Sequence, residues 1–185
     1  MVPIETVDLL AGVLTVAAQV FAVFLVLALI LERRGTLRSF TQLVERHALR
    51  LSFAATLAAV LGSLYYSEVV GYEPCFLCWW QRVFMYPQVL IAGIALWMND
   101  RHALRYIMAL SAVGAAVAGY HYLLEWGLVP SGLCPATGPN CAQRFVYEFG
   151  YITIPMMGLT VFVISFLVAF AGRERHPVDS EAKSR

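Results

Sequence analysis

Long apolar runs alternate with short polar segments along the whole chain. Each run has about 20 residues, the length that a helix needs to cross about 30 Å of hydrocarbon. A helix also satisfies its backbone polar groups internally, as lipid requires. The pattern therefore predicts an all-α membrane protein with five transmembrane helices. Their approximate limits are Leu9–Leu31, Leu51–Val70, Trp79–Met98, Ala103–Leu124 and Ile152–Ala171.

The composition favours a membrane protein over a soluble helical bundle. Hydrophobic residues make up 60% of the 185 residues and charged residues only 14%, and the mean hydropathy is +0.70. An average soluble domain is about a quarter charged. Five buried helices in so short a chain would leave too little polar surface to cover them. The formal net charge of +1 gives no indication of a nucleic-acid partner, and we expect none.

The positive charges predict the orientation in the membrane. The segment 32–50, the turn after the third run and the C-terminal tail together hold 11 of the 13 lysines and arginines. The positive-inside rule then places these segments and the C-terminus in the cytoplasm of a bacterial-type plasma membrane. The N-terminus, with Glu5 and Asp8 but no basic residue, is expected outside. The first run lacks a basic leader and a small-residue cleavage site, so we expect it to be retained.

Both pairs of cysteines fall on the predicted outer side, the oxidising side where disulfides persist. Cys75 and Cys78 lie between the second and third runs, and Cys134 and Cys141 between the fourth and fifth. Three interpretations compete: structural disulfides, a four-cysteine metal site, and a redox relay. A C-x-x-C ring is too small to add much stability, and six intervening residues are unusual for half of a zinc site. The C-x-x-C spacing is typical of redox pairs, so a redox relay is favoured, with no metal.

Arg82 follows Cys78 by four residues, on the same face of the helix expected to start near Cys78. Its side chain leans back toward that cysteine. Both the helix N-terminus and the guanidinium favour a thiolate. The alternative is an arginine that reaches the membrane interface with no further role. A cation beside a lipid-accessible thiolate can hold a quinone carbonyl oxygen and the negative charge that develops on reduction.

Two stretches resemble a known family. Residues 72–87 read YEPCFLCWWQRVFMYP, and residues 149–156 read FGYITIPM. The first combines the C-x-x-C pair, the arginine four residues later and an aromatic-proline ending. Together they resemble the disulfide-bond formation protein family DsbB, most closely its disulfide formation protein C (BdbC) branch. The resemblance covers about residues 49–171.

The resemblance implies a four-helix bundle and a thiol:quinone oxidoreductase. Such an enzyme reoxidises an extracytoplasmic thioredoxin-fold oxidase, similar to DsbA or BdbD, and so promotes disulfide formation in exported proteins. The electrons pass to ubiquinone or menaquinone in the membrane pool. Two rival functions stay open: a reductase that runs the same cysteines in reverse, and a non-enzymatic membrane protein with two structural disulfides.

The resemblance also implies roles for individual residues. Cys75–Cys78 is the quinone-proximal disulfide, with Cys78 contacting the quinone, and Arg82 is the cation beside it. Cys134–Cys141 is the shuttle disulfide, with Cys134 attacked by the partner. His121 occupies the position of a histidine that lies near the quinone in the family. The alternative for His121 is a structural pairing with Glu125, four residues later.

The chain departs from the family pattern at its N-terminus. We expect residues 1–48 to form an extra transmembrane helix and a basic linker, 49–172 the four-helix core, and 173–185 a disordered cytoplasmic tail. Thr15 and Gln19 are the polar positions in the first run, which predicts a lipid-facing addition. The aromatic pattern of residues 142–150 predicts a short amphipathic helix at the membrane interface.

Overall fold

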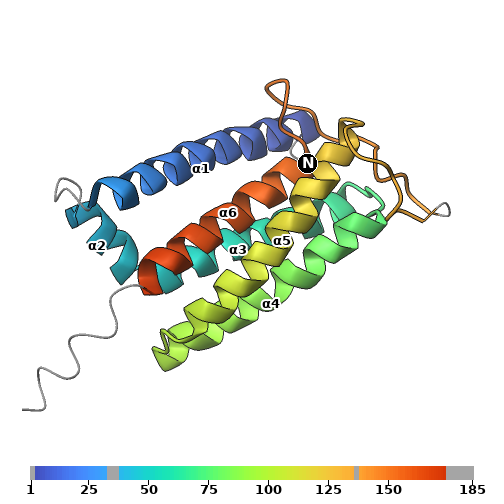
Figure 1. Ribbon diagram of the computed structural model, residues 1–185. Helices are drawn as coiled ribbons and strands as arrows, with labels where there is room; N and C mark the ends of the chain where they lie inside the picture. The colour runs from blue at the N-terminus through green and yellow to red at the C-terminus, as the bar shows by residue number, and fades with distance from the viewer. Residues whose placement is uncertain (1–2, 33–37, 136–137, 174–185) are drawn as a thin grey trace, which may run out of the picture.

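The computed structural model describes residues 3–32, 38–135 and 138–173, and helices dominate them (Figure 1). The C-terminal tail predicted to be disordered lies outside the described residues, apart from Arg173. The helices are α1 (Ile4–Glu32), α2 (Arg38–Arg46), α3 (Ala48–Leu64), the π-helix η1 (Tyr65–Val69), α4 (Phe76–Met98), α5 (Ala103–Glu125) and α6 (Ile154–Arg173).

Helices α3, α4, α5 and α6 form a four-helix bundle. Each contacts its neighbours in the order α3, α4, α5, α6 and back to α3, whereas the diagonal contacts are few. Helix α1 packs outside this ring along α6 (Figure 1). The predicted fold class, an all-α four-helix bundle with one additional N-terminal helix, is confirmed.

Four of the five predicted spans are long and apolar enough to cross a membrane. They are α1, α3 with η1, α5 and α6. Helix α4 does not meet this test, although its 23 residues are sufficient in length. Gln81, Arg82 and Gln88 lower its hydropathy. Because α4 packs along α3 and α5, we keep it as a predicted fifth span.

Helix α1 is more than a lipid-facing addition, and that prediction is wrong for its polar residues. Gln19 donates to Thr160 Oγ1 on α6 (3.1 Å) and accepts from the Tyr151 hydroxyl (2.7 Å). Nearer the N-terminus, the Tyr66 hydroxyl donates to Asp8 Oδ1 (2.8 Å). Buried polar groups require partners in an apolar medium, so these contacts orient one face of α1 toward the core.

The bundle interior contains a second polar contact, between α4 and α5. Gln88, which is fully buried, accepts from Ser111 Oγ (2.9 Å) and donates to the Phe84 carbonyl (2.9 Å). On α5, Gly114 lies against the buried ring of Phe162, where a Cβ atom would overlap the ring. Small residues allow helices to approach closely in membrane bundles.

The basic segments meet at one end of the bundle. The Arg101 guanidinium donates to the carbonyl of Glu45 (2.7 Å), in the segment 32–50, and to that of Gly172 (3.3 Å), directly before the C-terminal tail. The linker there includes the short helix α2, which the sequence analysis missed. Thr41 and Val44 of α2 are buried. This end lies opposite the segment 126–153, which connects α5 to α6 (Figure 1).

The predicted helix over residues 142–150 is wrong. The chain there makes turns, and Glu148 and Ile152 form an isolated antiparallel bridge. Phe149 and Gly150 both have positive φ (51° and 79°), a left-handed conformation that a right-handed helix excludes. The aromatic spacing that suggested a helix serves tertiary contacts instead: Phe145 stacks on Tyr72, with ring centroids 4.5 Å apart.

Candidate redox site

Cys75 is the N-cap of α4. Its backbone is extended (φ −70°, ψ 172°), and its Sγ accepts the backbone N–H of Cys78 at 3.3 Å. The preceding helix has ended by Gly71, whose φ of +83° suits glycine. The third run was predicted to become helical near Cys78. The helix in fact begins at Phe76, so Cys75 rather than Cys78 occupies the capping position, where unpaired N–H groups stabilise an anion.

The sulfurs of the first pair are in contact. Cys75 Sγ and Cys78 Sγ lie 2.7 Å apart, and the structure records both as free cysteines. The contact with the Cys78 side chain holds the pKa of Cys75 well below its ordinary value, with a further contribution from His121. The thiolate is the nucleophilic form. In the reduced pair, therefore, the geometry places the negative charge on Cys75.

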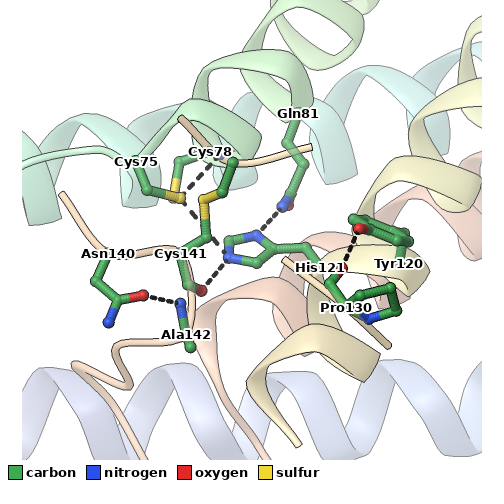
Figure 2. Close-up of a disulfide and its surroundings, with 10 residues drawn as sticks. Cys75, Cys78, Gln81, Tyr120, His121, Pro130, Asn140, Cys141 and Ala142 are labelled. Atoms are coloured by element: carbon green, nitrogen blue, oxygen red, sulfur yellow. Dashed lines mark hydrogen bonds between the residues drawn. A yellow bond between two sulfur atoms is a disulfide. The ribbon is translucent and has the colours of Figure 1, made fainter. Parts of the chain in front are cut away.

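The second pair lies in the non-helical segment between α5 and α6. Cys134 and Cys141 are joined by a disulfide. Cys141 is only 2% exposed, whereas Cys134 is half-buried. Local hydrogen bonds shape this segment (Figure 2): Tyr120 donates to the Pro130 carbonyl (2.6 Å), and Asn140 Oδ1 accepts the Ala142 N–H (2.9 Å).

His121 of α5 contacts one member of each cysteine pair, as Figure 2 shows. Its Nε2 is 3.0 Å from the Cys141 carbonyl oxygen and 3.7 Å from Cys75 Sγ. Its Nδ1 is 2.8 Å from Gln81 Nε2 of α4. Both ring nitrogens are thus occupied by partners other than Glu125, the partner considered in the sequence analysis.

One apolar cluster encloses both pairs. Its buried members are Cys75, Leu77, Leu124 and Cys141, and Cys78 and Cys134 pack against it. The two most buried cysteines, one from each pair, are therefore neighbours although 66 positions separate them. Thiol–disulfide exchange requires that sulfurs of the two pairs can approach each other, and a shared cluster brings the two pairs into one part of the fold.

Comparison with known proteins assigns this arrangement to a family. The sequence model described as "Disulfide bond formation protein DsbB" matches residues 45–172. The chain belongs to the DsbB family. Membership supports a role in disulfide formation, and the resemblance identified from the sequence is confirmed.

Individual relatives agree with this assignment. A protein of Bacillus anthracis named "Probable disulfide formation protein C 1" is 39% identical over 129 residues, which cover 67% of this chain and 93% of that protein. "Disulfide bond formation protein C" of Bacillus subtilis is 40% identical over 114 residues, covering 61% and 83%. A "Probable disulfide formation protein" of Coxiella burnetii is 36% identical over 134 residues, covering 71% and 91%. No solved structure matches the chain.

In this DsbB-family chain, Arg82 points toward α3. Its Nε donates to Ser63 Oγ (2.9 Å) and its Nη2 to the Ser63 carbonyl (3.0 Å). The guanidinium also lies 5.3 Å from the ring centroid of Trp79, within cation–π range. Ser63 directly precedes the end of α3 and the π-helical turn, a local feature that often accompanies functional sites.

A metal ion would have one set of ligands in this part of the chain. Among the described residues, the ligand atoms of Cys75, Cys78 and His121 lie within 4.8 Å of one another. The four-cysteine site considered from the sequence does not form here, because Cys134 and Cys141 are bonded to each other. The three-ligand group includes the sulfurs of Cys75 and Cys78, the same two that would form the disulfide of the first pair.

Gln81 and Ser63 are site residues that the sequence analysis did not assign. Gln81 was visible as a polar residue inside an apolar run, directly before Arg82. Its partner His121 is 40 positions away, and Ser63 is 19 positions from Arg82. Polar residues within an apolar run are a signal, but only the packing of helices identifies their partners.

Proposed function

We propose that this chain is a membrane thiol:quinone oxidoreductase that reoxidises an extracytoplasmic thioredoxin-fold thiol oxidase. The observation that carries the proposal is the shared cluster in which one cysteine of each pair contacts His121 Nε2, Cys75 through its sulfur and Cys141 through its backbone carbonyl. Two isolated structural disulfides would not need this proximity, whereas a relay that passes electrons from one pair to the other requires it.

The first exchange takes place at the second pair. A thiolate of the reduced partner attacks Cys134, the more accessible sulfur, and forms a mixed disulfide while Cys141 leaves as a thiolate. The partner's second thiolate then attacks its own mixed-disulfide sulfur and releases Cys134. The partner leaves with a disulfide, and the second pair holds the two electrons.

The second exchange joins the pairs. The Cys141 thiolate attacks Cys75, forming a Cys75–Cys141 disulfide and releasing Cys78 as a thiolate. Cys134 then attacks Cys141, which restores the second disulfide and leaves the first pair reduced. The first pair would give up two electrons and two protons as the Cys75–Cys78 bond closes again, and a quinone bound beside Cys78 would supply the two-electron acceptor.

The residues around Cys78 fit a quinone. Trp79 and Trp80 expose about half of their surface on α4, in the part of the helix that begins at the cysteines. Of the five donors of a guanidinium, two on Arg82 go to Ser63, and no further partner is recorded for the others among the described residues. We propose that Cys78 and Arg82 face the quinone, with His121 behind Cys75.

The charge distribution supports the proposed orientation. Arg101, Arg105 and Arg173 lie together at the end opposite the cysteines. By the positive-inside rule this end is cytoplasmic. Both cysteine pairs and the N-terminus then lie outside, where a secreted partner can reach Cys134.

The direct test is quinone reduction by purified protein in lipid, driven by a reduced thioredoxin-fold oxidase. Wild-type protein should form one quinol for each partner disulfide, and serine variants of Cys75, Cys78, Cys134 and Cys141 should each stop this coupled reaction. Arg82→Met should raise the KM for quinone more than that for the partner. If all four serine variants turned over normally, the proposal would be wrong.

A further inference from the structure

His121 can satisfy its contacts in only one neutral protonation form. The Cys141 carbonyl can only accept a hydrogen bond, so the 3.0 Å contact requires a proton on Nε2. A neutral imidazole then has no proton on Nδ1, which must accept. The Gln81 amide nitrogen, 2.8 Å from Nδ1, supplies that donor. The contacts of both ring nitrogens are therefore mutually consistent for a neutral ring.

The Gln81 side chain has little freedom to reorient. Gln81 is 7% exposed, and its Oε1 lies only 2.6 Å from the position that a Cβ atom would take on Gly158 of α6. Only a glycine at 158 leaves room for the amide there. The amide thus fits between α4, α5 and α6 with its nitrogen toward His121.

We propose that Gln81 is a positioning residue that keeps the His121 proton on Nε2, where the N–H holds the Cys141 segment against Cys75. The hydrogen-bond series runs from α4 through α5 to the segment of the second pair without placing a formal charge on Gln81 or His121. A role of this hydrogen-bond series in electron transfer rests on the proposed function, whereas the protonation form of His121 does not.

An amide suits this position better than a carboxylate. A glutamate at 81 would present only acceptors to Nδ1 and would require a second ring proton, creating a charged pair inside the cluster. A methionine would fill a similar volume but donate nothing, which leaves Nδ1 without a partner. The two variants therefore change the ring in different, measurable ways.

Nitrogen NMR of histidine-labelled protein reports the protonation form directly, with the His121 signal assigned from a His121→Asn variant. Wild type should show a neutral ring protonated at Nε2. Gln81→Glu should show a ring protonated at both nitrogens at neutral pH. Gln81→Met should show a mixture of the two neutral forms.

A cross-linking rate tests the positioning. A protein with Cys78→Ser and Cys134→Ser keeps only Cys75 and Cys141, and diamide should join them rapidly. Adding Gln81→Met should slow this about fivefold, the effect of one lost hydrogen bond of ordinary strength. Gln88→Met is the matched control, because Gln88 is another buried glutamine of α4 bonded to α5. It should change the rate less than about twofold.

The outcomes separate the two proposals, because neither measurement uses a quinone or a partner. An unchanged His121 spectrum in both Gln81 variants, or equal cross-linking rates for Gln81→Met and Gln88→Met, would overturn the positioning role. If Gln81→Met did not fold, the Gln81→Glu spectrum would decide the question alone. Failure of wild-type protein to reduce quinone would overturn the proposed function and leave the positioning role standing.

Discussion

The two cysteine pairs are built differently. Cys75 and Cys78 are separated by two residues at the start of a long helix, and Cys75 is fixed there by a capping bond. Cys134 and Cys141 lie in a turn-rich segment between two helices. A helix start presents a sulfur in one fixed geometry, which suits a small acceptor in the membrane. A loop presents an accessible sulfur to a protein partner.

The pairs are alike in one respect: each has a buried and a more exposed member. Cys75 is 3% exposed and Cys141 is 2% exposed, whereas Cys78 and Cys134 are only partly buried. The buried members belong to one apolar cluster, and both contact His121 Nε2. This division suggests that exchange between the pairs takes place inside the protein, and that exchange with outside molecules uses the other two sulfurs.

Removing one pair at a time should give the largest effects. Cys78→Ser should reduce quinone reduction to background with every thiol donor, because the first pair can no longer close. Replacing Cys134 and Cys141 together by serine should abolish turnover with a protein partner but preserve it with dithiothreitol, which is small enough to reduce the first pair directly. Quinol formation with each donor measures both. Equal loss with both donors would contradict the assignment of the second pair to the protein partner and of the first pair to the quinone.

The first pair should also differ from an ordinary thiol in its pH dependence. Contact with the Cys78 side chain, and after it with His121, lowers the pKa of Cys75. In reduced protein, alkylation of Cys75 by iodoacetamide should therefore slow less as the pH falls below 8 than alkylation of an unperturbed thiol with a pKa of about 8.5, which slows about tenfold per pH unit. Mass spectrometry of the Cys75 peptide measures the rate. The same decline as that of an ordinary thiol would show that Cys78 and His121 do not stabilise the Cys75 thiolate.

Gly158→Ala should weaken the contact between the pairs without unfolding the bundle. The added Cβ would lie 2.6 Å from Gln81 Oε1 and would displace the Gln81 amide from His121. Turnover with the protein partner should fall about fivefold, the equivalent of one hydrogen bond. Gly119→Ala in α5 is the control, since no atom lies within 4 Å of its Cβ position. Similar turnover in both variants would contradict a role of the Gln81–His121 contact in electron transfer between the two pairs.

The smallest effect concerns the attachment of α1. Tyr151→Phe removes the hydroxyl that donates to Gln19 and should lower the free energy of unfolding by about 1 kcal/mol, measured by thermal unfolding in detergent. Tyr106→Phe, at an exposed tyrosine, is the control and should have no effect. No difference between the two would mean that the Tyr151–Gln19 hydrogen bond does not help to hold α1 against the bundle.

The helices could be predicted from the sequence because hydropathy and length alone define a membrane-spanning run. Their exact starts could not. The stretch Cys75-Phe76-Leu77-Cys78 is too short and apolar to show where the helix begins, and the capping bond that decides it joins a side chain to a backbone N–H. Residues 142–150 were misread because aromatic spacing does not reveal the positive φ of Phe149.

The cysteines of the candidate site could be identified from spacing, but the neighbours that connect the pairs could not. Gln81 meets His121 only because α4 packs against α5, and the amide fits only because Gly158 of α6 lacks a side chain. Arg82 was expected to lean toward Cys78, but its hydrogen bonds go to Ser63, on a helix whose packing the local pattern does not determine.

The contacts of α1 affect the order in which the chain can assemble. Asp8 holds Tyr66, Tyr66 stacks on Tyr72, and Tyr72 stacks on Phe145, four residues beyond Cys141. During synthesis the first of these residues emerges long before the last. The N-terminal helix can therefore complete these contacts only after most of the protein has been translated. The aromatic stack can form only after the segment that holds Cys134 and Cys141 has been synthesised.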